Sequence, residues 1–262
     1  MPELPEVEMA RRYLQATSLH QTILSARVLD ERILSGVTAA RMDRALTGRQ
    51  FDCAMRHGKR LFLKLQDDLW LTLHLGLTGM LIHLESGQDE PNHTRLLVIY
   101  ESGSRLAFDD LRIFGEAGIT KSPQLFIKER NIGPDALQQD LNGFLESMIG
   151  RKGLIKPALL NQRLVAGLGN LYADEALFQA GICPMARSLS VEQLTDLFSS
   201  FQEVLKTSIA VHAHLDELPR SYLLPHRHPG GRCPLDGALL SREKIGGRTS
   251  YYCPMHQKMK KS

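Results

Sequence analysis

The chain has 262 residues, of which 43% are hydrophobic, and it carries a formal net charge of +3 and four cysteines. This length allows one large domain or two smaller ones, each with a sizeable core. The sequence has no run of 18 apolar residues and no signal-peptide pattern at its start, so it predicts no membrane span. Four cysteines are too few for a disulfide scaffold of this size, which favours a reducing, cytoplasmic setting.

The charge is unevenly distributed along the chain. Residues 220–262 hold nine lysines and arginines against Asp236 and Glu243, a net of +7, so the remaining 219 residues sum to −4. A basic C-terminal region on a mildly acidic body favours a polyanionic partner. For residues 258–261, a solvated tail that only keeps the protein in solution is the alternative.

Residues 1–8, Met-Pro-Glu-Leu-Pro-Glu-Val-Glu, open the chain with two prolines and three carboxylates. Pro5 suits the first turn of a helix, where its missing N–H has no partner to lose. Removal of Met1 leaves Pro2 as a free secondary amine, and an α-amino pKa of about 7.7–8.0 keeps a useful fraction unprotonated near neutrality. Such an amine can attack a carbonyl and form an iminium that acts as an electron sink. An ordinary capped helix also explains these residues and, on them alone, is the simpler interpretation.

After this helix, residues 22 to about 127 are predicted to form mostly strands. Alternating apolar and polar residues, separated by glycine turns, favour short strands at 60–65, 69–75, 80–84, 95–100 and 105–109. Many short strands at this spacing favour a β-sandwich over a parallel sheet.

From residues 131–135 onward the pattern becomes helical, which places a domain boundary near 130. Helical spacing predicts helices at 138–149, 154–161, 170–180 and 190–211. Between the second and third, Gly167 and Gly169 allow close approach of a ligand to the backbone, and Asn170 can cap the following helix. This turn is therefore a candidate anion site for a DNA phosphate, and a plain turn between two helices is the alternative.

The C-terminal cysteines have the spacing of a metal site. Cys233-x2-Asp236 and Cys253-x2-His256 are separated by 16 residues, as in a four-ligand zinc ribbon. Replacement of Asp236 by His226 or His228, and a hairpin that folds without metal, are the alternatives. Arg248, next to Gly246-Gly247, is placed on a strand of this hairpin where it can reach a phosphate.

Three turns of the β-rich half carry residues suited to nucleic acid. Residues 56–59 place Lys59 at a sheet edge, and residues 74–79 form a tight loop with an apolar tip. Arg112 and Phe114 share a face if their segment is extended. An exposed leucine, phenylalanine and arginine can fill a gap in a base stack, although each alone is more often a packing residue.

Six stretches, in chain order, resemble one known family. They are residues 2–8, 56–59, 74–76, 110–115, 131–135 and 159–181 (LLNQRLVAGLGNLYADEALFQAG). On these residues the chain resembles the bacterial DNA glycosylases of the formamidopyrimidine-DNA glycosylase and endonuclease VIII family, over essentially its whole length. The N-terminal start and the Arg112–Phe114 pair are closer to the formamidopyrimidine branch.

The resemblance implies an α+β fold in three parts. These are an N-terminal β-sandwich with a flanking helix (1–130), a helix-two-turn-helix domain (131–215) and a zinc-finger-like β-hairpin (216–262). It also implies a monomeric base-excision-repair enzyme, both glycosylase and AP lyase, acting on double-stranded DNA with an oxidised base or an abasic site. Such enzymes flip the damaged nucleotide and attack its C1′ with the N-terminal proline. The base leaves, and the resulting Schiff base (iminium) drives β/δ-elimination of the 3′ and usually the 5′ phosphate.

Carried over residue by residue, the resemblance assigns a role to each site residue. Pro2 is the nucleophile, Glu3 the general acid/base and Lys59 the phosphate-binding residue beside the lesion. The expected DNA contacts are Glu6, His74, Leu77, Arg112, Phe114, Lys156, Asn170 and Arg248, and the expected zinc ligands are Cys233, Asp236, Cys253 and His256.

Three features depart from the usual family pattern. Leu77 stands where the formamidopyrimidine branch usually has methionine, and Asp236 and His256 replace two cysteines of the finger. Residues 208–233 are shorter than in members with a lesion-capping loop that closes over 8-oxoguanine. The preferred lesion therefore stays open among 8-oxoguanine, formamidopyrimidines and oxidised pyrimidines.

Two other functions were weighed against this one. A non-catalytic protein that binds damaged DNA would keep the helical element and the finger, with Met1 retained over Pro2. A metal-dependent hydrolase would use His212, His214, His226 and His228, although these residues follow no fixed ligand motif.

Overall fold

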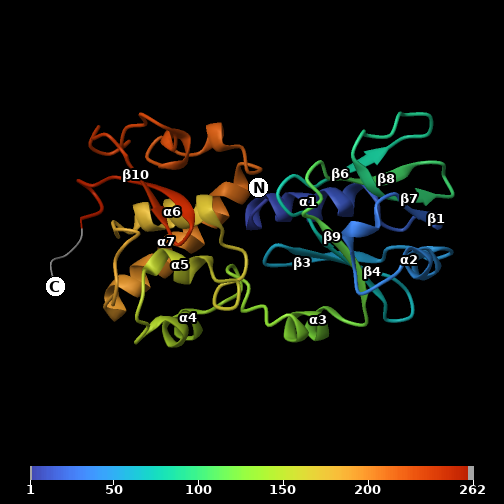
Figure 1. Cartoon of the computed structure of the whole chain (residues 1–262), viewed down its shortest axis with the longest axis horizontal. Helices are drawn as coiled ribbons and strands as arrows, with labels where there is room; N and C mark the ends of the chain where they lie inside the picture. Colours follow the sequence, from blue (N-terminus) through green and yellow to red (C-terminus); the bar gives the residue numbers. More distant parts are fainter. Residues whose placement is uncertain (1, 259–262) are drawn as a thin grey trace. The chain divides into compact units, whose positions relative to one another are not determined.

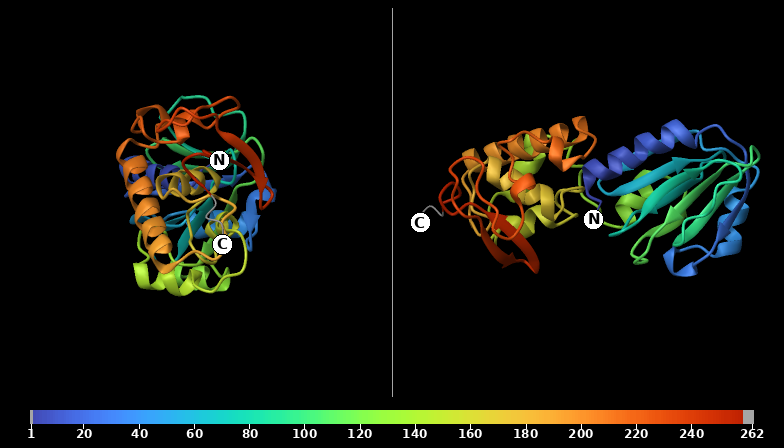
Figure 2. Two further views of the ribbon diagram at one scale, coloured as in Figure 1. Left: turned by 90° about the vertical axis from the view of Figure 1, so that its left-hand side faces the viewer. Right: turned by 90° about the horizontal axis from the view of Figure 1, so that it is seen from above.

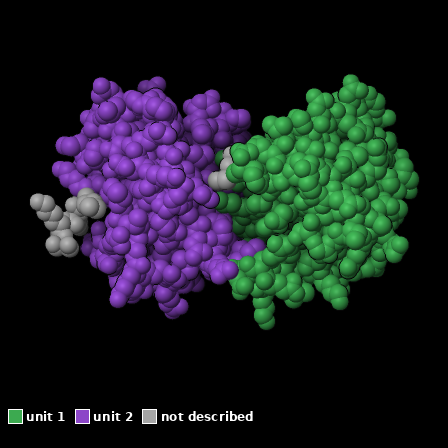
Figure 3. All heavy atoms as spheres, in the orientation of Figure 1, with its two compact units in different colours: residues 1–2, 6–131 green, residues 3–5, 132–262 purple. Residues whose placement is uncertain are grey.

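The computed structural model describes residues 2–258 and divides into two compact units, coloured separately in Figure 3. The N-terminal unit contains Pro2 and residues 6–131, and the C-terminal unit contains residues 3–5 and those from Ile132 onward. The predicted division at 130 and 215 into three domains stays a prediction. Met1 and the tail lysines Lys260 and Lys261 lie outside the described residues.

Helix α1 (Leu4–Thr17) begins one residue before the predicted proline and runs alongside the strands of the N-terminal unit (Figure 2). Val7 and Leu14 on one face are buried in the core of this unit. Leu4 and Pro5 at its start belong by their contacts to the C-terminal unit.

Two antiparallel-rich sheets form the N-terminal unit (Figure 1). The first has the order β1 (Ile23–Val28), β7 (Thr94–Tyr100), β8 (Arg105–Asp109) and β6 (Met80–Leu84). The second has the order β2 (Leu34–Ser35), β9 (Glu116–Thr120), β5 (Trp70–His74), β4 (Arg60–Lys64) and β3 (Cys53–His57). Only the short β2–β9 pair is parallel among these strands of the described chain.

The inward faces of both sheets share one hydrophobic core. Leu63 and Leu71 from the second sheet lie in the same buried cluster as Val98 and Leu106 from the first. Burying a leucine or valine side chain contributes about 1.5–3 kcal/mol, so this shared core holds the two sheets face to face. The predicted β-sandwich is confirmed.

Two helices interrupt the region that was predicted as mostly strands. Helix α2 (Ala39–Leu46) follows the N-cap Thr38 and buries Met42 and Leu46, which are four residues apart on one helical face. Helix α3 (Pro123–Glu129) follows the N-cap Ser122, with proline in its first turn. No strand was predicted at either segment, and neither helix was predicted; their N-caps are the local signals that mark them.

The C-terminal unit is helical with a terminal hairpin. Its elements are α4 (Leu141–Met148), α5 (Ile155–Leu160), α6 (Asn170–Gln179), α7 (Val191–Ala210), the 3₁₀ turns η2 (Leu215–Glu217) and η3 (Leu224–His226), and strands β10 (Ser241–Ile245) and β11 (Arg248–Tyr252). Helix α6 is buried from Tyr172 to Phe178 on all sides. Helix α7 begins with a capping box of Ser190 and Gln193. The four predicted helices are confirmed, with the start of α6 at the predicted residue and the other ends trimmed by one to three residues. None of the helices in residues 2–258 has the length and apolarity needed to cross a membrane.

Candidate functional site

Glu3 occupies the N-terminus of helix α6. Its side chain is buried, and its two carboxylate oxygens accept hydrogen bonds from the backbone N–H groups of Leu171 (3.0 Å) and Tyr172 (3.3 Å). Leu4 N–H also donates to Gly167 O at 3.2 Å, so the start of the chain is fastened to the turn before α6. The unpaired N–H groups and the dipole at a helix N-terminus stabilise the negative charge of such a carboxylate.

The two glycines of this turn make room for the N-terminal segment. A Cβ atom on Gly167 would lie 2.5 Å from Leu4 Cδ1, and one on Gly169 would lie 2.6 Å from Glu3 Oε2. The prediction of an anion site at this helix N-terminus therefore needs a correction. The anion found there is the chain's own Glu3, and Asn170 makes no side-chain capping bond because Glu3 takes that place.

Lys156, on helix α5, makes different contacts from those predicted. Its side chain is fully buried, with Nζ 2.6 Å from Asp174 Oδ1 and donating to the Ser250 hydroxyl. Burial lowers the pKa of Lys156, and the Asp174 carboxylate offsets part of this effect. An ammonium with no exposed surface cannot reach a solvent-side phosphate, so the structure corrects the predicted DNA contact to an internal ion pair.

Asn170 and Arg248 are brought close together by strand β11. Asn170 Nδ2 donates to Thr249 O at 2.9 Å, directly beside the exposed Arg248. Asn170 Oδ1 is buried and accepts no hydrogen bond from the described residues. Gly246 and Gly247 both have positive φ, as a tight hairpin turn between β10 and β11 requires.

Lys59 lies in the turn between β3 and β4, at the end of the edge strand of its sheet. Arg56 at the base of this turn donates to Gly58 O at 3.1 Å and to Glu8 Oε2 on helix α1 at 3.3 Å. Glu8 also accepts from Arg11, and its hydrogen bonds with arginines outweigh burial and hold its pKa at about 2. Sequence analysis missed this arginine–glutamate contact, since nothing in the spacing links residues 8 and 56.

His74 ends strand β5, opposite Arg60 on β4 and Glu116 on β9. Burial, with further help from Arg60, lowers the pKa of His74 to about 4, so the ring is neutral near pH 7. Its Nδ1 atom is buried without a hydrogen-bond partner among residues 2–258. A neutral imidazole of this kind can serve DNA as a hydrogen-bond donor and not as a charge.

Leu77, Arg112 and Phe114 lie in two loops of the N-terminal unit that contact each other. The Arg112 guanidinium lies 5.0 Å from the centre of the Phe114 ring, and both side chains are exposed, whereas Leu77 is half-buried. The segment is a turn with Ile113 at φ +56°, so the condition of an extended segment, under which the two residues would share a face, is not met. Because the turn brings arginine and phenylalanine together, their predicted proximity still holds.

Three of the four predicted metal ligands are gathered. Cys233, Asp236 and Cys253 place one donor atom each within 4.8 Å of one another, and Cys253 Sγ donates to Asp236 Oδ2 at 3.2 Å. The fourth, His256, has its Nε2 atom 2.8 Å from Phe178 O and its ring against the Phe178 ring. The prediction that His256 completes the group is therefore corrected, because its ring is engaged by helix α6.

The four histidines weighed for a hydrolase do not come together. In residues 2–258, the Cys233 group is the only set of three or more potential ligand side chains that meets the distance for a metal. The helices instead anchor the segment that holds these histidines through Glu175, which accepts from Leu223 N (3.1 Å) and Leu224 N (2.7 Å).

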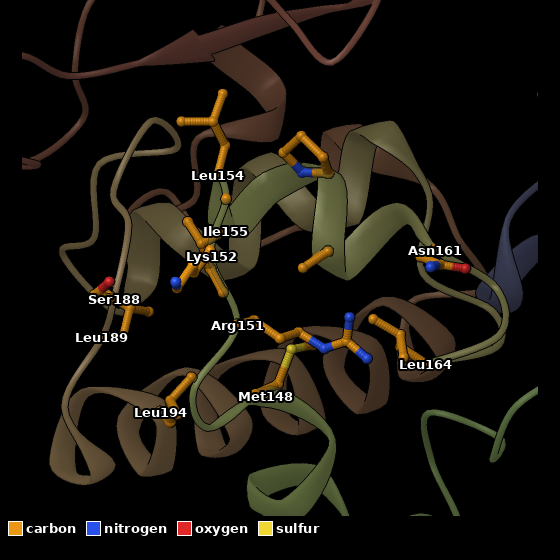
Figure 4. A pocket seen from close by; sticks show the side chains of 13 residues that line it. Met148, Arg151, Lys152, Leu154, Ile155, Asn161, Leu164, Ser188, Leu189 and Leu194 are labelled. Atoms are coloured by element: carbon orange, nitrogen blue, oxygen red, sulfur yellow. The ribbon is translucent and has the colours of Figure 1, made fainter.

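A cavity of about 240 Å³ in the C-terminal unit contains none of the predicted site residues (Figure 4). It lies among the loop before α5, helix α5 and the start of α7, with Met148, Leu164 and Leu194 in its lining and the cations of Arg151 and Lys152 beside them. The candidate site residues thus lie outside this cavity, on turns and at the ends of helices and strands.

Family models and relatives agree with this arrangement. A model described as the formamidopyrimidine-DNA glycosylase N-terminal domain matches residues 1–117, and one described as the formamidopyrimidine-DNA glycosylase H2TH domain matches residues 132–217. A formamidopyrimidine-DNA glycosylase of Pelotomaculum thermopropionicum is 33% identical, covering 99% of this chain and 100% of its own length. That of Syntrophomonas wolfei is 37% identical, covering 97% and 98%.

Solved structures are similar over the same range. The Lactococcus lactis formamidopyrimidine-DNA glycosylase bound to DNA with an AP site has a TM-score of 0.89 and 29% identity, covering 98% of this chain and 100% of its own. A MutM structure in complex with DNA containing carbocyclic 8-oxoguanine has a TM-score of 0.88, 29% identity and the same coverage.

Proposed function

The chain belongs to the formamidopyrimidine-DNA glycosylase family, and from this we propose that it removes oxidised bases from duplex DNA and then cleaves the abasic site. The proposal includes both activities, glycosylase and AP lyase, in base excision repair. We assign the enzyme to the cytoplasm, in keeping with its four free cysteines, and we propose that it acts as a monomer.

The chemistry we propose starts at Pro2. Once Met1 is removed, the Pro2 amine attacks C1′ of a flipped nucleotide, and the base leaves with a proton. Opening of the sugar ring produces an iminium, and removal of a proton from C2′ expels the 3′ phosphate. Glu3, adjacent in the chain, is the group that we expect to carry protons in these steps.

One observation carries this proposal: the Glu3 carboxylate is buried at the α6 N-terminus, in a space that exists because residues 167 and 169 are glycines. A plain N-terminal helix has no need of a side chain fixed in this way. Two N–H donors fix the orientation of the acid, and the residue before it is the amine. The arrangement thus favours a working amine–acid pair over the non-catalytic DNA-binding alternative.

The remaining site residues fit contacts with DNA. Lys59 in the β3–β4 turn, Asn170 and Arg248 are placed in the proposal as phosphate contacts, and Glu6 as a residue that helps hold the proline end. His74 is added as a neutral donor. Leu77, Arg112 and Phe114 fill the space left by the flipped base, with Arg112 facing the orphan partner.

Borohydride trapping tests the proposal directly. The protein is incubated with a duplex that contains one abasic site, reduced, and digested, and mass spectrometry locates the cross-link. We expect the adduct on Pro2, and its loss in a variant with an N-terminal extension. Full lyase activity with a blocked terminus would rule out this mechanism.

We also propose that Cys233, Asp236 and Cys253 hold a structural zinc ion. Two thiolates and a carboxylate are a donor set that zinc accepts, and the thiol proton between Cys253 and Asp236 is one that a cation would displace. When bound, zinc would cross-link the hairpin and would take no part in the reaction. Its tetrahedral preference requires a fourth donor, for which water is available beside the exposed Asp236.

Metal analysis of the purified protein tests this assignment. We expect about one zinc per chain in the wild type and clearly less in Asp236→Ala, with His256→Ala close to wild type because its ring contacts Phe178 O instead. Equal zinc content in wild type and Asp236→Ala would remove Asp236 from the site.

The lesion is the least constrained part of the proposal. The segment between α7 and β10 contains only two short 3₁₀ turns among its described elements, η2 and η3. We propose formamidopyrimidines as the main substrates, because the resemblance is to that branch and the lesion-capping stretch is short. A panel of duplexes with formamidopyrimidine, 8-oxoguanine or an oxidised pyrimidine decides the order of preference.

A further inference from the structure

We propose that the buried Asp110 and the half-buried Thr78 form a clamp that fixes both void-filling loops, the loop with Leu77 and the loop with Arg112 and Phe114. The two residues are positioning residues, since they act through the side chains they hold. The inference rests on the proposed function, because it concerns how the gap left by the flipped nucleotide is filled.

The Asp110 carboxylate joins the two loops. It is fully buried, with Oδ1 accepting from the Thr78 hydroxyl at 2.5 Å and from Arg112 N at 3.3 Å, and Oδ2 accepting from Gly115 N at 2.7 Å. Thr78 Oγ1 in turn accepts from Arg112 N at 3.1 Å. One carboxylate and one hydroxyl therefore hold the backbone on both sides of Ile113 and Phe114.

The clamp is attached to the rigid part of the sandwich. Asp110 N–H donates to His93 O at 3.0 Å, and Arg95 Nε donates to Asp110 O at 2.9 Å. Arg95 lies on strand β7 of the first sheet. The position of Asp110 is thus determined by the sheet, and the loops are determined by Asp110.

Close backbone contacts leave the loops little freedom. A Cβ atom on Gly76 would lie 2.5 Å from Phe114 O and 2.6 Å from Gly115 N. The backbone of the Leu77 loop is therefore in direct contact with the backbone that carries Phe114. A shift of either loop has to move the other as well.

Ile113 has a strained backbone conformation, which has to be held in place by its surroundings. Its φ of +56° is unfavourable for a β-branched residue, and such strain persists only where the surroundings determine it. Asp110 accepts hydrogen bonds from the backbone N–H groups of Arg112 and Gly115, which flank Ile113 and Phe114. In this strained turn Arg112 lies over the Phe114 ring, so relaxation of Ile113 would separate the two side chains.

If the clamp acts as proposed, its loss should lower activity on duplex DNA more than on single-stranded DNA. A general loss of protein stability would lower activity on both. Filling a gap matters when a nucleotide is flipped from a duplex, whereas a single-stranded abasic site has no stack to repair. Thr78→Val removes the hydroxyl with little change of shape, so Asp110 Oδ1 and Arg112 N each lose one partner and keep only the 3.3 Å hydrogen bond between them. Thr78→Ser keeps the hydroxyl. Thr120→Val, on β9 of the same unit, is the matched control, since within residues 2–258 the Thr120 hydroxyl donates only to Ser122 O.

The experiment measures kcat/KM for excision from a lesion duplex and for lyase activity on a single-stranded abasic oligonucleotide. For Thr78→Val we expect a loss of about 10- to 100-fold on the duplex and less than about twofold on the single strand. Thr78→Ser and Thr120→Val should stay near wild type on both, and Arg112→Ala should resemble Thr78→Val.

Each other outcome has a clear meaning. Equal losses on both substrates, or no loss on the duplex, would overturn the clamp. Failure of the proposed function looks different, because the wild type would then show neither excision nor a borohydride adduct on either substrate.

Discussion

Gly169→Ala is the sharpest perturbation of the proposed active site. The backbone of Gly169 is extended, with φ −130° and ψ −163°, so alanine adopts it without strain. The added methyl group would instead lie 2.6 Å from Glu3 Oε2 and closer still to the rest of the carboxylate. The substitution therefore expels Glu3 from the α6 N-terminus and leaves its side-chain chemistry unchanged.

The size of the effect follows from the two hydrogen bonds that are lost. A hydrogen bond to a charged group contributes about 1.5–3 kcal/mol. One of the pair is long at 3.3 Å, and the expelled carboxylate regains water, so we expect the attachment of the N-terminal segment to weaken by ~2–4 kcal/mol in total. Loss of a positioned acid/base group should lower the rate of base excision by about 10²–10⁴-fold.

Single-turnover excision from a lesion duplex measures this loss, and hydrogen exchange of the Leu171 and Tyr172 amides reports the displacement of Glu3. Gly143→Ala on helix α4 is the matched control, because its nearest neighbour, Asp140 Oδ1, is 3.3 Å from the added methyl group. We expect the control to keep wild-type activity. Wild-type excision by Gly169→Ala, together with hydrogen exchange that shows Glu3 displaced from the Leu171 and Tyr172 amides, would refute the assigned role of Glu3.

Three further predictions concern the C-terminal unit. Lys156→Met leaves the buried Asp174 without its ammonium partner and should destabilise the unit by about 3 kcal/mol in urea denaturation; an unchanged midpoint would contradict the buried ion pair. Burial raises the pKa of Glu175 from 4.5 to about 7, so as the pH rises the unfolded chain loses this proton first and folding becomes less favourable. Wild-type stability should therefore fall by about 3 kcal/mol relative to Glu175→Gln between pH 4.5 and 7, and parallel urea midpoints across this range would show the prediction to be wrong. Arg248→Ala should weaken DNA binding uniformly across sequences and lower the salt slope by about 1, and an identical slope would remove Arg248 from the phosphate contacts.

Local signals predicted most of the fold. The sandwich strands at 60–65 and 95–100 and the helices at 170–180 and 190–211 follow directly from apolar spacing, since period-2 and period-3.6 patterns are read within one element. Helices α2 and α3 were missed because each is only two turns long, too short for periodicity to exceed the surrounding strand pattern. Their N-caps, Thr38 and Ser122, were the available signal.

The roles of the site residues could be predicted only where a family motif includes the residue. Pro2 and Glu3 came from the family resemblance, and their spacing alone favoured a capped helix. The burial of Lys156 could not be predicted locally, because it depends on Asp174 and Ser250, which are 18 and 94 residues further along the chain. No local sequence pattern shows that a lysine in the first turn of a helix forms an ion pair with a buried carboxylate of the same chain and does not contact DNA.

Asp174 also bears on the role of zinc. Its Oδ1 atom forms an ion pair with Lys156 Nζ (2.6 Å), and its Oδ2 atom accepts from Arg227 Nε (2.9 Å) and Tyr251 N (3.2 Å). Arg227 and Asn170 both donate to Thr249 O. These contacts fasten strand β11 to helix α6 without any of the three cysteine and aspartate donors. The residue after Arg248 is therefore held by charge and hydrogen bonds, and a metal ion would act mainly on the far end of the hairpin. Chelation should then loosen the segment around Asp236 more than it displaces Arg248, and the salt slope of DNA binding should change less than in Arg248→Ala.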